Sequence, residues 1–232
     1  MRPNVDALDT HTMRRRLHQS LGYVAAVMAI LACLVDMASA DQQCRTSSTS
    51  FEVPRSDLTN AEALANRLAA LSPKVNREEA ELLADYAYAT VSQLRRQYRM
   101  FGTPIFNNFL VYHGLKKRGY CYHWAEDLLL ALDALKLTSL ELRWGEAHAG
   151  NWRENNCVVV TAKGQPFNRG MILECWKHFG HLRWGPVIGD PDPYAENAAY
   201  ARFIRARSVQ KTFRVNQQLA LQTQTDAKQS TK

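Results

Sequence analysis

The chain has few cysteines, and they are not paired along the sequence. Five of its 232 residues are cysteines, and the four that follow residue 40 stand far apart: Cys44, Cys121, Cys157 and Cys175. A structural zinc site or an attached haem needs closely spaced cysteines. A glycine-rich phosphate loop is also missing. The sequence therefore predicts no metal ion and no other cofactor.

A basic stripe with interleaved aromatic side chains is missing too. The formal net charge is +7, but the excess is scattered over short pairs such as Arg95-Arg96 and Lys116-Lys117. Such pairs usually lie on solvated faces, whereas nucleic-acid binding needs a concentrated basic surface. We therefore predict no nucleic-acid partner.

The first forty residues have the order of a secretory signal. The basic run Arg14–Arg16 precedes an apolar stretch over residues 21–35, and the small-residue tripeptide Ala38–Ala40 follows. The apolar stretch is too short to form a transmembrane helix, and the acidic residue Asp36 follows it directly. We expect residues 1–40 to be removed as a signal segment. The mature chain, beginning near Asp41, is then periplasmic or extracellular.

The same segment offers an alternative to this cleavage. Residues 30–33 loosely resemble a bacterial lipoprotein box, in which case Cys33 would carry a lipid. The sequence predicts contact with a membrane only through the signal segment or through this lipid. Both alternatives stay open.

The remainder is predicted to form one α+β domain, residues 59–215, after a linker over 41–58 and before a disordered polar tail over 216–232. Helical spacing of apolar residues predicts helices, and short β-branched runs between turns predict antiparallel strands. The predicted helices cover residues 60–71 (Thr59 as N-cap), 77–98 and 121–135, the predicted strands cover 137–144, 155–162, 171–176 and 182–188, and a connector covers 104–117. We expect the helix that begins at Cys121 to pack on the sheet.

Cys121 is the candidate nucleophile. It lies in the first turn of its predicted helix, where unpaired backbone N–H groups and the positive end of the helix dipole favour a thiolate. The alternative is that Cys121 is a small buried residue or one half of a disulfide.

The residues around Cys121 resemble those of a known family. The run reads Gly119-Tyr120-Cys121-Tyr122-His123-Trp124-Ala125-Glu126-Asp127-Leu128, and a later run reads Ile172-Leu173-Glu174-Cys175-Trp176. Over about residues 105–190 the chain resembles the transglutaminase-like branch of the papain-like cysteine proteins. More narrowly, it is similar to bacterial exported proteins with the sequence motif Gly-x-Cys-x-His-Trp-Ala-x-Asp-Leu. The resemblance implies a cysteine-bearing helix packed on a small antiparallel sheet.

The resemblance also implies roles for individual residues. In this family a cysteine attacks a carbonyl, a histidine carries the proton, and an acid or amide orients the histidine. Cys121 matches the nucleophile, and Glu174 stands where the orienting acid is expected. The family histidine position falls on Asn155, whose amide cannot accept a proton from a thiol. His148 is then the only credible base, provided that its loop folds back toward Cys121.

Two functions fit this pattern, and both stay open. The protein is either a thiol hydrolase or acyl transferase acting on amide or peptide bonds, or a non-catalytic member that binds a peptide or protein of the cell envelope. Asn155 favours the second function. In either case the side chains predicted to bind the substrate or partner are Trp124, Asn155 and Trp176.

The register of the two central predicted strands decides which side chains share a face. A four-residue loop between the strands sets Asn155 opposite Glu174. A seven-residue loop sets Cys157 opposite Cys175 instead, which permits a disulfide. The sequence does not choose between these registers.

Overall fold

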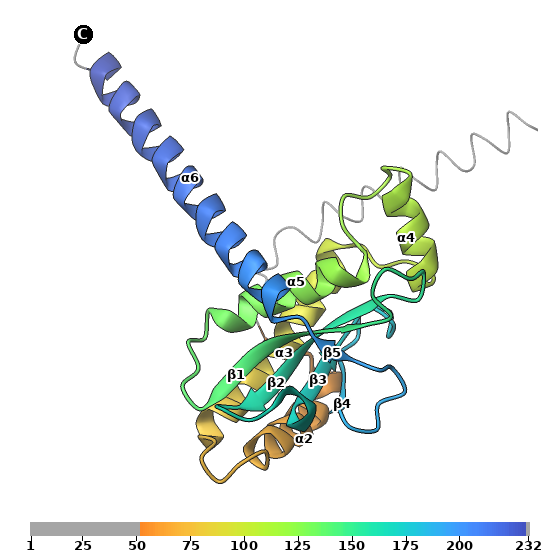
Figure 1. Ribbon diagram of the computed structural model, residues 1–232. Coiled ribbons are helices and arrows are strands. Elements are labelled where there is room, and N and C mark those ends of the chain that lie inside the picture. The colour runs from red at the N-terminus through yellow and green to blue at the C-terminus, as the bar shows by residue number, and fades with distance from the viewer. Residues whose placement is uncertain (1–51, 231–232) are drawn as a thin grey trace, which may run out of the picture. The chain divides into compact units, whose positions relative to one another are not determined.

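The computed structural model describes residues 52–230, which belong to one unit of the chain, Phe51–Lys232. The predicted signal segment, Cys33 and Cys44 lie outside the described residues. Within the described range, no helix is both long and apolar enough to cross a membrane. Figure 1 shows an antiparallel sheet with several helices behind it.

The described residues form five α-helices and two short 3-10 helices. The α-helices are α2 (Leu58–Ala69), α3 (Arg77–Gln97), α4 (Pro104–Tyr112), α5 (Cys121–Asp133) and α6 (Ala198–Ser230), and the 3-10 helices are η2 (Arg55–Asp57) and η3 (Phe167–Arg169). The predictions of α3 and α5 are confirmed to within two residues at each end.

Within residues 52–230, five antiparallel strands form one sheet in the order β4-β3-β2-β1-β5. They are β1 (Leu140–Ala147), β2 (Asn155–Ala162), β3 (Met171–Glu174), β4 (Arg183–Pro186) and β5 (Ala195–Glu196). The predicted α+β class is therefore confirmed.

Hydrogen bonds at the N-terminus of α3 attach this helix to the sheet. The Asn76 side chain caps α3 by accepting from the backbone N–H groups of Glu78 and Glu79. The Glu79 carboxylate accepts backbone and hydroxyl hydrogen bonds from Thr138 and Ser139, just before β1. Burial alone would raise the pKa of Glu79, but these hydrogen bonds outweigh it and lower the pKa to about 2.

Strand β1 lies three residues later than the strand predicted over 137–144, and β5 was not predicted. Three predictions about helices also differ from the structure. Helix α2 begins at Leu58, with Asp57 rather than Thr59 at its N-cap. The predicted connector contains α4, because Thr103 accepts from the N–H of Phe106 as an N-cap and proline suits the first helical position. Helix α6 extends to Ser230, through the segment predicted to be a disordered tail; its Gln, Leu and Ala residues are good helix formers.

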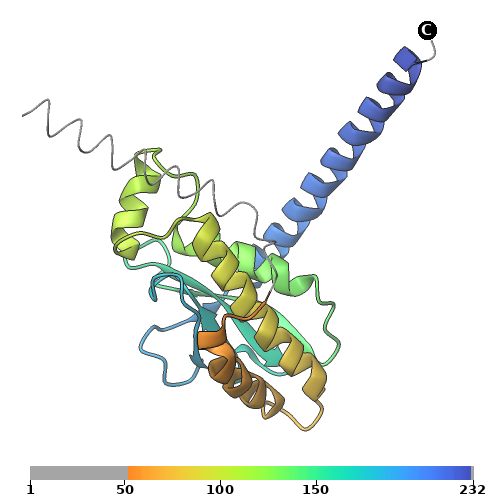
Figure 2. The ribbon, with the colours of Figure 1, turned by 180° about the vertical axis from the view of Figure 1, so that it is seen from behind.

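The sheet has a core on each face. The larger core lies between the sheet and helices α2, α3 and α5, which Figure 2 shows on this side. It takes Val158 and Val160 from β2 and Leu173 from β3. The smaller core takes the alternate residues Val159 and Ile172 and packs against the partly buried side chains of Phe167, in η3, and Val187. Alternation along each strand therefore decides whether a side chain faces the helices.

The observed register differs from both predicted ones. Val158 pairs with Leu173, and Val160 pairs with Met171. Glu174, one residue beyond Leu173, consequently faces away from the helices. The cross-strand disulfide that one of those registers permits is not formed: Cys157 lies in the smaller core, Cys175 lies in the larger one, and both are free thiols.

Candidate functional site

The turn before α5 is fixed by the backbone geometry of Gly119 and by hydrogen bonds from the Arg118 guanidinium. Gly119 has a φ of 153°, which favours glycine, and a Cβ there would lie 3.1 Å from the Val111 side chain. The Arg118 guanidinium donates to Asp127 at 2.7 Å and to the hydroxyl of Tyr98 at 3.0 Å. These contacts hold Cys121 at the first position of the helix.

The Cys121 sulfur lies between a backbone carbonyl and a side-chain amide. The thiol donates to the carbonyl oxygen of Glu154 at 3.4 Å, and the Asn156 amide nitrogen donates to the sulfur at 3.4 Å. Among residues 52–230, no histidine forms a hydrogen bond with this sulfur. Both contacts fit a protonated thiol, which donates one hydrogen bond and accepts the other.

The orientation of the Asn156 amide is set by three neighbours. Its nitrogen also donates to a carboxylate oxygen of Glu154 at 3.1 Å. Its oxygen accepts from the indole N–H of Trp144 at 3.2 Å. An indole nitrogen is only a donor and a carboxylate only an acceptor, so the amide cannot be flipped without losing both bonds.

Burial has the largest influence on the pKa of the Cys121 thiol. Cys121 is 6% exposed, and desolvation raises the pKa of its thiol above the ordinary value. The hydrogen bond from Asn156 lowers the pKa, but by less, and the charge of Glu154 raises it further. The position at the start of α5 therefore does not yield a thiolate at neutral pH.

His123 caps the helix instead of serving the thiol. Its Nδ1 accepts from the backbone N–H groups of Gly119 at 3.1 Å and Tyr120 at 3.3 Å. Burial, together with the charges of Arg118 and Arg207, lowers the pKa of His123 to about 4. The imidazole is therefore neutral at pH 7, which is the state that can accept these bonds.

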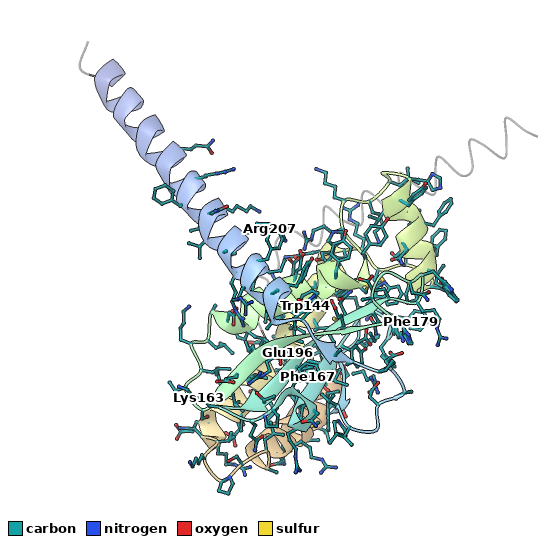
Figure 3. The ribbon with its side chains drawn as sticks, viewed as in Figure 1. Trp144, Lys163, Phe167, Phe179, Glu196 and Arg207 are labelled. Atoms are coloured by element: carbon teal, nitrogen blue, oxygen red, sulfur yellow. The ribbon has the colours of Figure 1, made fainter. Side chains whose placement is uncertain are left out.

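A small cleft opens beside the partners of Cys121. It has a volume of about 130 Å³ and is lined by Tyr122, Trp144, Glu146, Glu154, Asn156 and Tyr200, which we call the Asn156 cleft. Trp144 and Tyr200 meet with ring centroids 4.6 Å apart. Figure 3 shows Trp144 near the start of α6, the helix that supplies Tyr200. Three of the six lining residues, Tyr122, Trp144 and Tyr200, are therefore aromatic.

The two carboxylates of the Asn156 cleft have no cationic partner among the described residues. Glu146 accepts from the amide of Asn197 at 2.9 Å, and Glu154 accepts from the N–H of Gly150 at 2.8 Å and from Asn156. Each carboxylate has about four lone-pair sites, so both keep free acceptors. The cleft thus combines negative charge with aromatic faces.

The predicted catalytic residues do not meet. Glu174 is 1% exposed and lies on the face of the sheet opposite to Cys121. His148 has a left-handed backbone with φ 54°, and its Nε2 lies 3.8 Å from a carboxylate oxygen of Asp192. Neither residue forms a hydrogen bond or an ion pair with Cys121.

The predicted substrate-binding residues are buried away from the Asn156 cleft. Trp124 and Trp176 belong to the larger core, and Trp124 packs edge-on against Tyr98 with centroids 4.7 Å apart. Asn155 points to the opposite face, where its amide donates to the hydroxyl of Tyr194 at 2.7 Å. None of the three lines the cleft.

A second group of polar residues occupies that opposite face. It consists of His148, Asn155, Glu174, Lys177, Asp192 and Tyr194, which we call the far-face cluster. Lys177 forms an ion pair with Asp192, and its backbone N–H donates to Glu174 at 2.8 Å. Burial raises the pKa of Glu174 to about 7, although this hydrogen bond and the charge of Lys177 lower it.

Sequence reasoning missed Asn156, which occupies the position beside the thiol. By the resemblance to the family, the histidine position falls on Asn155, one residue away. Because neighbouring residues of a strand point to opposite faces, a shift of one residue exchanges the two sides of the sheet. The valine pattern of β2 does not correct it, since both faces are apolar.

Comparisons with models of protein families, with curated proteins and with solved structures give no match. Within residues 52–230, no group of three or more His, Cys, Asp or Glu side chains has the geometry to hold a metal ion.

Proposed function

We propose that this protein is a non-catalytic binding module of the cell envelope, whose Asn156 cleft receives a basic side chain of a peptide or protein partner. On this proposal the chain keeps a transglutaminase-like arrangement, with a cysteine helix on an antiparallel sheet, but has an amide where the enzymes have an imidazole. Export by the N-terminal signal would bring it to the envelope.

The observation that carries the proposal is the Asn156 amide on the Cys121 sulfur at 3.4 Å. An amide cannot take a proton from a thiol, so the general base of cysteine catalysis has no counterpart there. The raised pKa of Cys121 also favours a non-catalytic role, because the nucleophile of such enzymes is the thiolate.

The composition of the cleft supports a cationic ligand group. An ammonium or guanidinium group is attracted both by carboxylates and by aromatic faces. The cleft volume of about 130 Å³ is below the roughly 300–1,000 Å³ of sites for whole small molecules. It therefore suits the end of one side chain. A hollow of about 520 Å³ near Leu132 and Arg205 is larger, but its Asp133 is already paired with Arg205.

Alkylation of Cys121 tests the absence of catalysis. We expect iodoacetamide to modify Cys121 more slowly than a free thiol with a pKa of about 8.5. Mass spectrometry of the peptide that contains Cys121 measures the rate. We also expect His148→Ala to leave the rate unchanged, since His148 contacts Asp192 instead of Cys121. A thiol that titrates well below the free value, and that loses this property in His148→Ala, would contradict the proposal.

A pair of peptides tests the binding site. We expect acetyl-Ala-Lys-Ala-amide to shift the indole N–H resonance of Trp144, assigned by its loss in Trp144→Phe, and the norleucine analogue to leave it unchanged. Glu154→Gln should weaken the binding at least about tenfold, which corresponds to about 1.4 kcal/mol. Glu62→Gln, on the exposed side of α2, is the matched control and should have no effect. Equal binding of the norleucine peptide would rule out a site for basic side chains.

A further inference from the structure

Large apolar side chains are concentrated on one exposed segment around α4. Fourteen large apolar side chains are exposed among the described residues, and six of them lie within residues 101–115: Phe101, Ile105, Phe106, Phe109, Tyr112 and Leu115. We call these six the α4 face. Tyr112 is 79% exposed. Exposed apolar surface of this density usually marks an interaction site.

The α4 face is held in place by a buried polar contact. The Asn107 amide nitrogen donates to the backbone carbonyls of Phe101 and Thr103, and its oxygen accepts from the Lys116 ammonium. Lys116 also donates to the carbonyl of Arg99 at 3.1 Å, which closes the segment into a loop. Asn107 is fully buried. The backbone thus presents the apolar side chains outward on a helix with satisfied polar groups.

The charges on the chain segment that carries the α4 face have one sign. Residues 86–125 contain no aspartate or glutamate, and they contain six lysines and arginines. Arg95, Arg96, Arg99 and Lys117 are exposed. The nearby Asp127 is paired with Arg118, which leaves the exposed cations in excess. A surface with aromatic side chains and excess cations matches the headgroup region of an anionic membrane.

We infer that the α4 face inserts into the headgroup layer of an anionic lipid membrane. The projecting position of α4, visible in Figures 1 and 2, lets the helix enter the lipid while the sheet stays in water. A projecting helix fits a deformable lipid surface without needing a complementary groove. This contact is separate from the Asn156 cleft and does not depend on the proposed function.

A tryptophan at position 112 gives a local readout in the full chain. Tyr112→Trp is to be mixed with vesicles of three parts phosphatidylcholine to one part phosphatidylglycerol, with brominated acyl chains as quenchers. We expect a blue shift and quenching beyond that of the wild-type chain, whose five tryptophans supply the background. The effect should be much weaker with phosphatidylcholine alone and at about 0.5 M salt. Leu82→Trp, an exposed position on α3, should show neither change.

Two substitutions test the same surface without a probe. Phe109→Ser combined with Tyr112→Ser should reduce the partition of the chain into the anionic vesicles at least about tenfold, with an unchanged unfolding curve, because both side chains are exposed. A tryptophan at position 112 that is not quenched would overturn the inference, even if the chain binds vesicles through its N-terminus. A fluorescence change that depends on protein concentration without vesicles would overturn it in favour of a second copy.

Discussion

The two faces of the sheet carry polar groups of opposite character. In the Asn156 cleft a neutral amide joins Cys121 to Trp144, and the carboxylates beside it stay unpaired among the described residues. In the far-face cluster the charges are paired or buried, as in the Lys177–Asp192 ion pair. Unpaired charge beside a cleft is available to a ligand, whereas paired charge is already satisfied. The first face is therefore the proposed binding site. In the far-face cluster, Glu174 Oε2 and Asn155 Oδ1 are buried without a hydrogen-bond partner among the described residues.

The largest expected effect comes from the aromatic wall of the Asn156 cleft. Trp144 is 1% exposed, and its N–H satisfies the oxygen of Asn156. Trp144→Ala should lower the free energy of unfolding by about 3–5 kcal/mol, because it opens a cavity and leaves a buried acceptor unpaired. Urea denaturation measures the loss. Trp152→Ala is the control, since Trp152 is 84% exposed, and it should change stability by less than about 0.5 kcal/mol. Equal losses in the two variants would remove the distinction between this wall and the surface.

The next effect is the pH dependence that distinguishes the two faces. Burial raises the pKa of Glu174 from 4.5 to about 7, so the folded protein binds a proton more tightly than the unfolded chain. The resulting stabilisation is complete below pH 4.5 and is lost as the pH rises through 7. Its size is about 3 kcal/mol at 1.36 kcal/mol per pKa unit.

Urea denaturation at several pH values between 4.5 and 8 measures this slope. Glu174→Gln should flatten it, because the amide does not titrate. Asn156→Ala, which removes no ionisable group, should lower stability at every pH and leave the slope unchanged. A slope that survives in Glu174→Gln would assign the pH dependence to another group.

The comparison of the faces also explains what the sequence could predict. Helix α3 and strand β2 were predicted almost to the residue, because an apolar period and a run of valines are local signals. Helix α4 was missed because residues 104–117 were interpreted as a connector, whereas Thr103 and Pro104 are start signals of a helix.

The site could be predicted only in part, because it depends on non-local geometry. The position of Cys121 at the start of a helix follows from its local motif and is confirmed. The partner of its sulfur depends on strand register, and a shift of one residue selects Asn155 or Asn156. The state of its thiol depends on burial by segments distant in sequence, which the helix-dipole argument does not include.

The smallest expected effect concerns the cap that holds Cys121 in position. His123→Ala removes the acceptor for the N–H groups of Gly119 and Tyr120 and should lower the free energy of unfolding by about 1 kcal/mol. His113→Ala, at an exposed position after α4, is the control and should be neutral. The pKa of His123 is lowered to about 4. The contribution of the neutral imidazole to the free energy of unfolding is therefore complete above pH 6.5 and is lost as the pH falls through 4. This pH dependence has the opposite sign to that of Glu174. Urea denaturation of His123→Ala and Glu174→Gln over the same pH range therefore distinguishes the contribution of the helix-covered face from that of the far face. If the loss in His123→Ala grew as the pH fell from 6.5 to 4, the capping role would be wrong.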